Sequence, residues 1–171
     1  MADVTLREAT DDDAAALAAT YRDAYAENRR LGFPAKSGSA TPEQVARWIR
    51  DHRVFVAESE GTVIGGVRLE RVDGSERSAA GSQQSATDDA IVTLSRLGVR
   101  ERWKGDGVGS QLLEHAERAA REAGYTTVRL TTPDEHPFLP EFYHAHGYEI
   151  TGDYPLAYRD YDEVVMEKSL D

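Results

Sequence analysis

The segment Gly105–Gly109 places three glycines at alternate positions between a predicted strand and a predicted helix. The strand is indicated by the β-branched and apolar residues of Ala90–Val99, and the helix by apolar residues at helical spacing through Val108–Ala123. Glycines spaced in this way let the backbone turn sharply and expose several N–H groups, behind which lies the positive end of the helix. Such a turn typically binds phosphate, so it predicts an α/β chain with a phosphate-bearing ligand.

Two familiar nucleotide-binding motifs do not fit this turn. The dinucleotide-binding pattern G-x-G-x-x-G requires glycine at position 110, where the chain has Ser110. The P-loop requires a Gly-Lys pair after four intervening residues, and no such pair follows Gly105. A turn without any ligand is the remaining alternative, and Lys104 beside the glycines favours an anionic ligand over it.

Charge and composition exclude several kinds of partner. The 171 residues include 20 Lys and Arg against 31 Asp and Glu, a formal net charge of -11. This acidic excess argues against binding to nucleic acid or to anionic membranes, since both depend on clustered cations. The chain has no cysteine, which excludes thiol nucleophiles and disulfides, and no histidine spacing typical of a metal site. No segment resembles a membrane span or a targeting sequence, so a cytoplasmic protein is expected.

The remaining patterns predict one domain over residues 1–171. Residues 72–89 are rich in Ser, Gln, Gly and Asp, so we expect a flexible loop there, either a lid or plain disorder. A loop is also expected over Asn28–Gly38. Gly147 is expected to close a short helix over His136–His146, with a late or distorted start as the alternative because of Pro137 and Pro140. The other predicted elements are strands at Val4–Glu8, Val54–Glu58, Val63–Arg71, Thr126–Thr131, Tyr148–Thr151 and Glu163–Leu170, helices at Ala14–Tyr25 and Thr41–Asp51, and a hairpin turn at Ser59–Thr62.

The order of these elements and the sequence Lys104-Gly105-Asp106-Gly107-Val108-Gly109 resemble the GNAT superfamily of acyl-CoA-dependent N-acyltransferases. That family's signature is Gln or Arg followed by x-x-G-x-G or x-x-G-x-A, here with Lys in the first place. Leu97-Gly98-Val99 also resembles the end of its fourth strand. The resemblance implies an α/β (α+β) fold with a mixed, mostly antiparallel sheet of six to seven strands, flanked by about four helices. It further implies an N-acetyltransferase that uses acetyl-CoA and no metal, with an amine of a small molecule or peptide as acceptor; relatives are often homodimers.

The resemblance assigns the cofactor-binding residues one by one. Backbone groups of Leu97 and Val99 would pair with the pantetheine arm, as an added strand would. The amides of Gly105–Ser110 would hold the pyrophosphate, and Lys104 would add one cationic contact. His136 stands where many relatives carry an Asn that contacts the cofactor. The expected cofactor-binding residues are therefore Leu97, Gly98, Val99, Lys104, Gly105, Asp106, Gly107, Val108, Gly109, Ser110 and His136.

A tyrosine is the expected catalytic acid. The sequence Phe142-Tyr143-His144-Ala145-His146-Gly147-Tyr148 resembles a family context in which a Phe-Tyr pair is followed, after three residues, by Gly and an aromatic residue. In that context Tyr143 takes the position of a general acid. A phenol, with an ordinary pKa near 10, is protonated at neutral pH and can donate to a departing thiolate. The alternative is that Tyr143 only packs on the sheet or on the cofactor.

The general base is open at the level of sequence. The predicted strand has no carboxylate within Thr93–Leu97, although many relatives carry one there. An acceptor ammonium must lose a proton before it attacks a thioester, so some base is required. Glu70, Asp88, Asp89 and an ordered water are the candidates.

The acceptor and two rival functions are also open. Arg29, Arg30 and Phe33 match the region that forms one wall of the acceptor site in the family, and two arginines there would favour an acceptor with a carboxylate or phosphate. The first rival function is a non-catalytic acyl-CoA-binding sensor or regulatory domain, motivated by the missing carboxylate. The second is an enzyme for another nucleotide ligand, motivated only by the glycine turn.

Overall fold

The computed structural model describes residues 3–32, 40–70, 90–154 and 162–170. Its strands are hydrogen-bonded in the order β1-β2-β3-β4-β5-β7-β6. The pairs β1–β2, β2–β3, β5–β7 and β6–β7 are antiparallel and the pair β4–β5 is parallel, which confirms the predicted mixed, mostly antiparallel sheet. The strands are β1 (Thr5–Glu8), β2 (Arg53–Ser59), β3 (Thr62–Glu70), β4 (Ile91–Val99), β5 (Thr127–Pro133), β6 (Glu149–Tyr154) and β7 (Glu163–Ser169), and the helices are α1 (Ala14–Ala24), α2 (Ala26–Arg30), α3 (Pro42–Asp51), α5 (Val108–Glu122) and α6 (Leu139–Ala145).

The chain divides into two compact units. The first comprises residues 1–69 and 95–116, with β1, β2, most of β3 and helices α1 to α3. The second comprises residues 70–94 and 117–171, with β5, α6, β6 and β7. Strand β4 and helix α5 contribute residues to both units.

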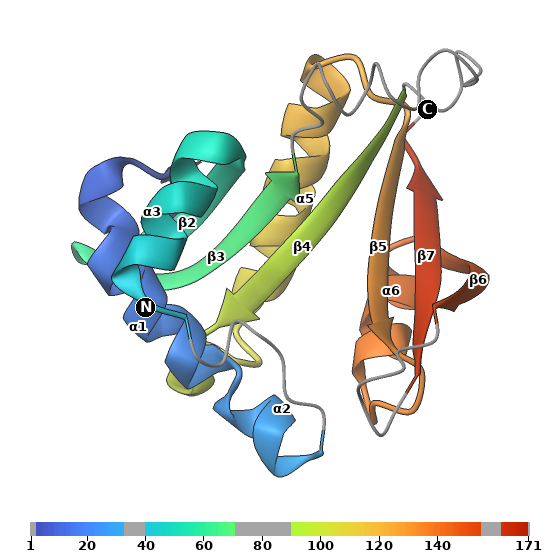
Figure 1. The fold of residues 1–171 in the computed structure, drawn as a ribbon, viewed down its shortest axis with the longest axis horizontal. Helices are drawn as coiled ribbons and strands as arrows, with labels where there is room; N and C mark the ends of the chain where they lie inside the picture. The colour runs from blue at the N-terminus through green and yellow to red at the C-terminus, as the bar shows by residue number, and fades with distance from the viewer. Residues whose placement is uncertain (1–2, 33–39, 71–89, 155–161, 171) are drawn as a thin grey trace. The chain divides into compact units, whose positions relative to one another are not determined.

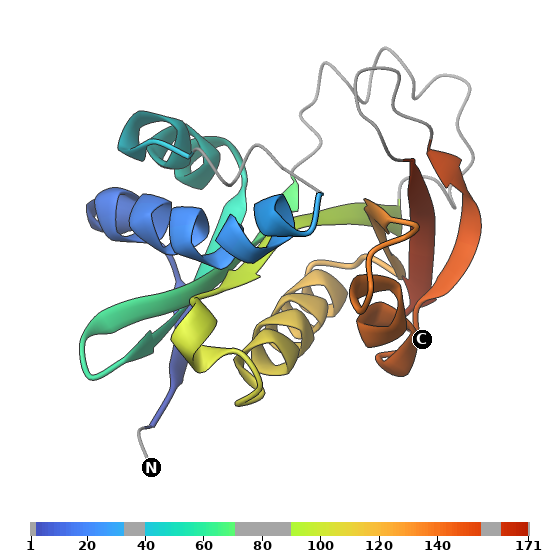
Figure 2. The same cartoon turned by 90° about the horizontal axis from the view of Figure 1, so that it is seen from below.

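Helices α1 and α3 cover one face of β2 and β3 in the first unit (Figures 1 and 2). On α1, Leu17, Ala18 and Tyr21 recur at helical spacing and are completely buried. They form one apolar core with Val45 of α3 and Val56 of β2. Burial of this face, rather than intrinsic helix propensity, supplies most of the stability of helices as short as α1 and α3.

Two adjacent glycines of β3 let helices approach both faces of the strand. A Cβ atom on Gly66 would lie 2.7 Å from the Leu17 Cδ1 of α1, and a Cβ atom on Gly65 would lie 2.9 Å from the Leu112 Cδ1 of α5. Successive strand residues face opposite sides of a sheet. The face of Gly66 is therefore the α1 face of β3, and the face of Gly65 is the α5 face.

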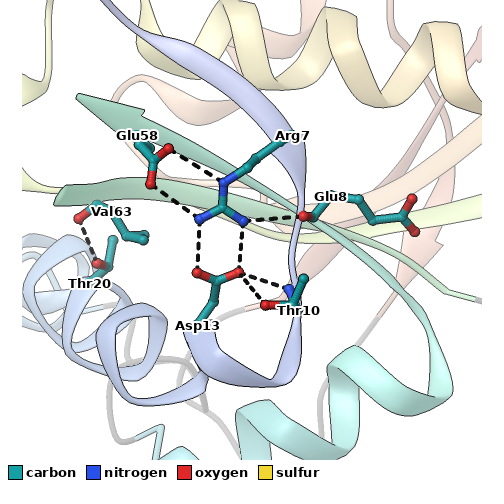
Figure 3. A network of polar contacts seen from close by, with 7 residues as sticks. All are labelled: Arg7, Glu8, Thr10, Asp13, Thr20, Glu58 and Val63. Atoms are coloured by element: carbon teal, nitrogen blue, oxygen red, sulfur yellow. Dashed lines mark hydrogen bonds and ion pairs between the residues drawn. The ribbon is translucent and has the colours of Figure 1, made fainter. Parts of the chain in front are cut away.

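Arg7 of β1 links the amino terminus of α1 to strand β2 (Figure 3). Its guanidinium donates to the Asp13 carboxylate at 2.8 and 2.9 Å and to Glu58 at 3.2 Å. The Asp13 carboxylate also accepts from the Thr10 backbone N–H at 2.8 Å. The hydrogen bonds from Arg7 are the main cause that lowers the pKa of Asp13 below its ordinary value of 3.8, against the opposing effect of burial.

Asp13→Asn is expected to reduce the free energy of unfolding by about 1–2 kcal/mol at pH 7, the range of a charge-assisted hydrogen-bonded pair that is partly exposed. Because the folded-state pKa of Asp13 lies below the unfolded value of 3.8, its contribution is complete above that value and is lost as the pH falls through the folded-state pKa. Urea unfolding at a series of pH values should therefore show the difference between wild type and variant shrinking in acid. Asp12→Asn, at an exposed neighbouring position, should track wild type throughout; an Asp13→Asn difference that is independent of pH would contradict this account.

In the second unit, β7 lies between β5 and β6 (Figure 1). Strand β5 pairs with β7 along its whole length, from Thr127 opposite Ser169 to Pro133 opposite Glu163. Strand β6 is at one end of the strand order, and its register with β7 is irregular between Ile150 and Gly152. Its side chains are mostly exposed, including Ile150.

A buried carboxylate joins α5 to β7 and to Tyr148, the residue before β6. The Glu117 side chain, 8% exposed, accepts hydrogen bonds at 2.9 Å from the Tyr148 hydroxyl and at 2.9 Å from the Lys168 ammonium. Burial is the main cause that raises the pKa of the Tyr148 phenol, with the Glu117 charge acting in the same direction. Tyr148 is therefore a permanent hydrogen-bond donor in this network.

Two predicted boundaries are wrong. The loop expected over Asn28–Gly38 begins later, because Ala26–Arg30 forms the short helix α2. The helix expected from His136 begins at Leu139.

The predicted hairpin turn is confirmed, with Glu60 at φ 52° and Gly61 at φ 81°, as in the two-residue turns that match strand twist. Among the described residues, no helix is long and apolar enough to cross a membrane.

Candidate active site

The glycine turn of the first unit has the backbone geometry that its sequence predicts. Gly105 has φ +89° and Gly107 has φ +84°, and helix α5 starts directly after them at Val108. Apart from the adjoining residues of the chain, no atom of the described residues lies within 4 Å of the position that a Cβ would occupy on either glycine, and both glycines are exposed. Glycine is required here by the left-handed backbone and not by crowding, which leaves the turn accessible from outside.

The segment before the turn is anchored to α1 and α2. The Glu101 N–H donates to the Asp23 carboxylate at 2.8 Å, and the Lys104 ammonium donates to the Ala24 carbonyl at 2.9 Å and to Glu27 at 3.1 Å. Arg30 forms an ion pair with Glu101. The Lys104 ammonium is thus hydrogen-bonded to residues of α1 and α2 in this structure. Its contact with a phosphate stays a prediction.

The end of β4 is packed tightly against α1. The Tyr25 hydroxyl donates to the Leu97 carbonyl at 2.6 Å, and a Cβ on Gly98 would lie 2.9 Å from Tyr25 Cε2. The Arg100 N–H donates to the Ile64 carbonyl of β3 at 2.8 Å. These contacts fix the backbone of Leu97–Val99, and the pairing of that backbone with a pantetheine arm stays a prediction.

His136 caps helix α6 in the second unit. Its ring is buried, 5% exposed, and its Nδ1 accepts from the N–H groups of Phe138 and Leu139, both at 3.2 Å. A side-chain acceptor at a helix start takes up N–H groups that have no partner within the helix, and an Asn oxygen would do the same. The cap explains why the helix starts after His136, while contact of His136 with a cofactor stays a prediction.

Tyr143 is held firmly on α6. Its side chain is 8% exposed, and its ring contacts Phe142 and Tyr148 at centroid distances of 5.2 and 5.8 Å. Gly147, at φ +97°, ends the helix as the sequence predicts, and the Tyr148 N–H returns to the Tyr143 carbonyl at 3.0 Å. The tyrosine therefore has little freedom to change its orientation.

The predicted site residues fall into two groups. Leu97–Val99 and Lys104–Ser110 belong to the first unit, and His136 and Tyr143 belong to the second. Glu70, a candidate base, is the half-buried last residue of β3. The other candidate residues Phe33, Asp88 and Asp89, and the predicted loop at 72–89, lie outside the described residues.

Sequence reasoning missed a second polar group in the first unit. Arg68 of β3, 8% exposed, donates from Nε to the Ser95 hydroxyl at 3.0 Å. The Cζ atoms of Arg68 and Arg96 lie 5.3 and 5.0 Å from the centroid of the Trp48 ring of α3. An arginine within the apolar run of β3 is the signal that could have pointed to this group. Among the described residues, no cluster of His, Asp and Glu side chains could hold a metal ion.

Comparison with known proteins agrees with this geometry. Residues 50–150 match the family model described as the acetyltransferase (GNAT) domain. The S-(2-succino)cysteine N-acetyltransferase of Bacillus subtilis (strain 168) is 26% identical over 166 residues, which cover 96% of this chain and 94% of that protein. The N-acetyltransferase from Staphylococcus aureus Mu50 has a similar fold, with a TM-score of 0.76, 18% identity and 99% of both chains covered.

A further fold relative is the PaiA N-acetyltransferase from Thermoplasma acidophilum, whose structure is a complex with coenzyme A. Its TM-score is 0.74 at 17% identity, with 98% of this chain and 99% of that chain covered. Together with the family match, these likenesses place the chain in a class of acyl-group transfer enzymes. The chain belongs to the GNAT acetyltransferase family and is an N-acetyltransferase.

Proposed function

We propose that this chain transfers the acetyl group of acetyl-CoA to a primary amine by direct attack. The observation that carries the proposal is the left-handed glycine turn, Gly105 and Gly107, running directly into the 15-residue helix α5 in a chain of the GNAT family. Exposed N–H groups at the positive end of a helix suit the pyrophosphate of coenzyme A. We further propose that both units belong to one catalytic domain.

The amides of Gly105–Ser110 hold the pyrophosphate, and backbone groups of Leu97 and Val99 pair with the pantetheine arm. Support for the second contact comes from the way Tyr25 and Gly98 fix the end of β4, because a rigid strand end binds an extended ligand at a lower entropic cost. In the reaction, the neutral amine nitrogen attacks the thioester carbonyl carbon and a C–N bond forms. The C–S bond then breaks, and the thiolate of coenzyme A takes a proton from Tyr143.

The proton that the amine loses passes to a base. Strand β4 has no Asp or Glu between Ile91 and Val99 that could act as this base. Within the described residues Glu70 is the candidate, and an ordered water is the alternative. The same observation on β4 defines the outcome that would contradict the proposal, a domain that binds acyl-CoA without catalysis. A catalyst must release one free thiol for each amine acetylated, whereas a sensor binds the cofactor and releases none.

Release of free thiol from acetyl-CoA, measured across a panel of amines, tests the proposal. We expect thiol release that depends on the amine, with an equal amount of acetylated amine by mass spectrometry. Saturable binding of coenzyme A without thiol release from any amine would favour the sensor. Stabilisation by NAD or ATP but not by coenzyme A in a thermal-shift assay would favour an enzyme for another nucleotide.

Gly107→Ala is expected to raise the KM for acetyl-CoA about tenfold and to lower the free energy of unfolding by about 1 kcal/mol. A Cβ at φ +84° strains the backbone, so the turn relaxes and its N–H groups lose their alignment. Gly124→Ala is the matched control, because Gly124 lies at the other end of α5, also has positive φ, and has no described residue beyond its chain neighbours within 4 Å of its Cβ position. Steady-state kinetics should show a raised KM only for Gly107→Ala; equal KM values in both variants would contradict the binding role of the turn.

A further inference from the structure

Arg68, Arg96 and Trp48 form a group of side chains that come from three elements of the first unit. Arg68 comes from β3, Arg96 from β4 and Trp48 from α3. Because both Cζ atoms lie about 5 Å from the same ring centroid, the two guanidinium groups are at most about 10 Å apart. Trp48, Ser95 and Arg96 are each partly exposed and Arg68 is buried, so solvent reaches part of this group.

A break in the regular alternation of β4 brings Ser95 and Arg96 to this group together. Gly98 faces Tyr21 of α1 and Tyr25 directly after it, so strict alternation would put Ser95 on the opposite side of the strand. The Ser95 hydroxyl nevertheless accepts from Arg68, which lies on the α1 face of β3, two residues after Gly66.

Arg96 has φ +54°, a conformation that is costly for a side chain other than glycine, and it marks the break. Strained residues of this kind persist only where the surrounding structure imposes them, and they concentrate at functional sites. The strained backbone at Arg96 is what brings its guanidinium over Trp48, beside that of Arg68.

The chemistry of the group matches a planar anion. Two guanidinium groups offer forked N–H donors, which bind a carboxylate through two parallel hydrogen bonds. Stacking on an indole orients a guanidinium without using its N–H groups as hydrogen-bond donors. The hydroxyl of Tyr21, completely buried beside Trp48, has no hydrogen-bond partner among the described residues and adds a further donor nearby.

We propose that Arg68 and Arg96 bind a carboxylate of the acceptor, so that the acceptor class is an amine that also carries a carboxylate, such as a free amino acid. This inference rests on the proposed acetyl transfer and names its substrate class. It places the anion-binding role on β3 and β4 instead of on Arg29 and Arg30 of α2.

Paired acceptors that differ only in the carboxylate test the assignment, for example leucine against isoamylamine and phenylalanine against phenethylamine. Thiol release from acetyl-CoA is expected to give a kcat/KM at least 100-fold higher for each amino acid. Arg96→Gln should reduce this preference by about 10- to 100-fold through the KM of the acceptor, with the KM of acetyl-CoA unchanged. Arg68→Lys, which keeps the charge but loses the fork, should reduce it in the same way.

Arg53→Gln is the control, since Arg53 also lies over an aromatic ring of the first unit, at 5.1 Å from the Phe55 centroid. It should leave the preference unchanged. Equal use of the paired acceptors by wild type, or an equal loss for both acceptors in Arg96→Gln, would overturn the assignment. If no amine releases thiol, the acetyl transfer fails, and a thermal shift with leucine in wild type but not in Arg96→Gln decides whether the carboxylate site exists.

Discussion

Replacing Tyr143 by phenylalanine is expected to lower kcat with acetyl-CoA by about 10²- to 10⁴-fold, the usual contribution of a positioned general acid. Phenylalanine keeps the ring contacts with Phe142 and Tyr148 and removes only the hydroxyl. The thiolate of coenzyme A would then leave without a proton donor. The melting temperature and the affinity for coenzyme A should stay close to those of wild type, because neither depends on this proton.

The thiol that leaves provides a sharper test of the acid role. Acetyl thioesters of more acidic thiols need less protonation on departure, so the loss of rate in Tyr143→Phe should shrink with such donors. Tyr154→Phe, at an exposed position of β6, is the control and should behave as wild type. An unchanged kcat in Tyr143→Phe would remove the acid role and leave Tyr143 as a packing residue.

Lys168→Met is expected to lower the free energy of unfolding by about 3 kcal/mol. This is the lower end of what removing one partner of a buried ion pair costs, because the Lys168 side chain is 26% exposed and that of Glu117 only 8%. The Glu117 carboxylate would keep the Tyr148 hydroxyl as a partner but lose the only cation that an ion pair among the described residues gives it. Methionine retains much of the aliphatic packing of Lys168 against Gly147. The loss of unfolding free energy therefore reflects the uncompensated charge of the Glu117 carboxylate. Urea unfolding of wild type and variant measures this loss.

Arg129→Met gives the matched comparison within the same unit. The pair of Arg129 with Glu167 is more exposed, with side-chain exposures of 44% and 24%, and its loss should cost less than about 1 kcal/mol. The double variant Lys168→Met with Glu117→Met should recover part of the lost stability, because it removes the stranded carboxylate. Equal costs for Lys168→Met and Arg129→Met would show that the Glu117 carboxylate is adequately solvated.

Local sequence signals predicted most of the fold. Helix α5 follows from the regular apolar spacing after Val108, and the β2–β3 turn follows from its polar, glycine-containing sequence. Pro137 and Pro140 allowed a late start of α6, but the acceptor role of His136 at that start was not predictable, because histidine is not among the usual helix caps. Helix α2 was missed because the arginines, glycines and proline of the segment were interpreted as a loop signal.

The functional residues too were predictable only where their signal is local in the sequence. The glycine turn was predictable because its conformation depends on residues that are adjacent in sequence. The contact of Lys104 with Glu27 joins positions 77 residues apart, and the meeting of Arg68 with Arg96 requires the break in β4 at a residue other than glycine. Contacts that depend on strand register and on an unusual φ leave no periodic signal in one sequence.

The irregular register of β6 bears on how copies of this chain meet. Strand β6 ends the hydrogen-bonding order, and an end strand normally offers a continuous row of N–H and C=O groups to any passing strand. The bulge between Ile150 and Gly152 interrupts that row, although Ile150 and Tyr154 leave apolar surface exposed there. This edge is therefore protected from edge-to-edge aggregation by its irregular backbone together with the exposed charges of Glu149 and Asp153.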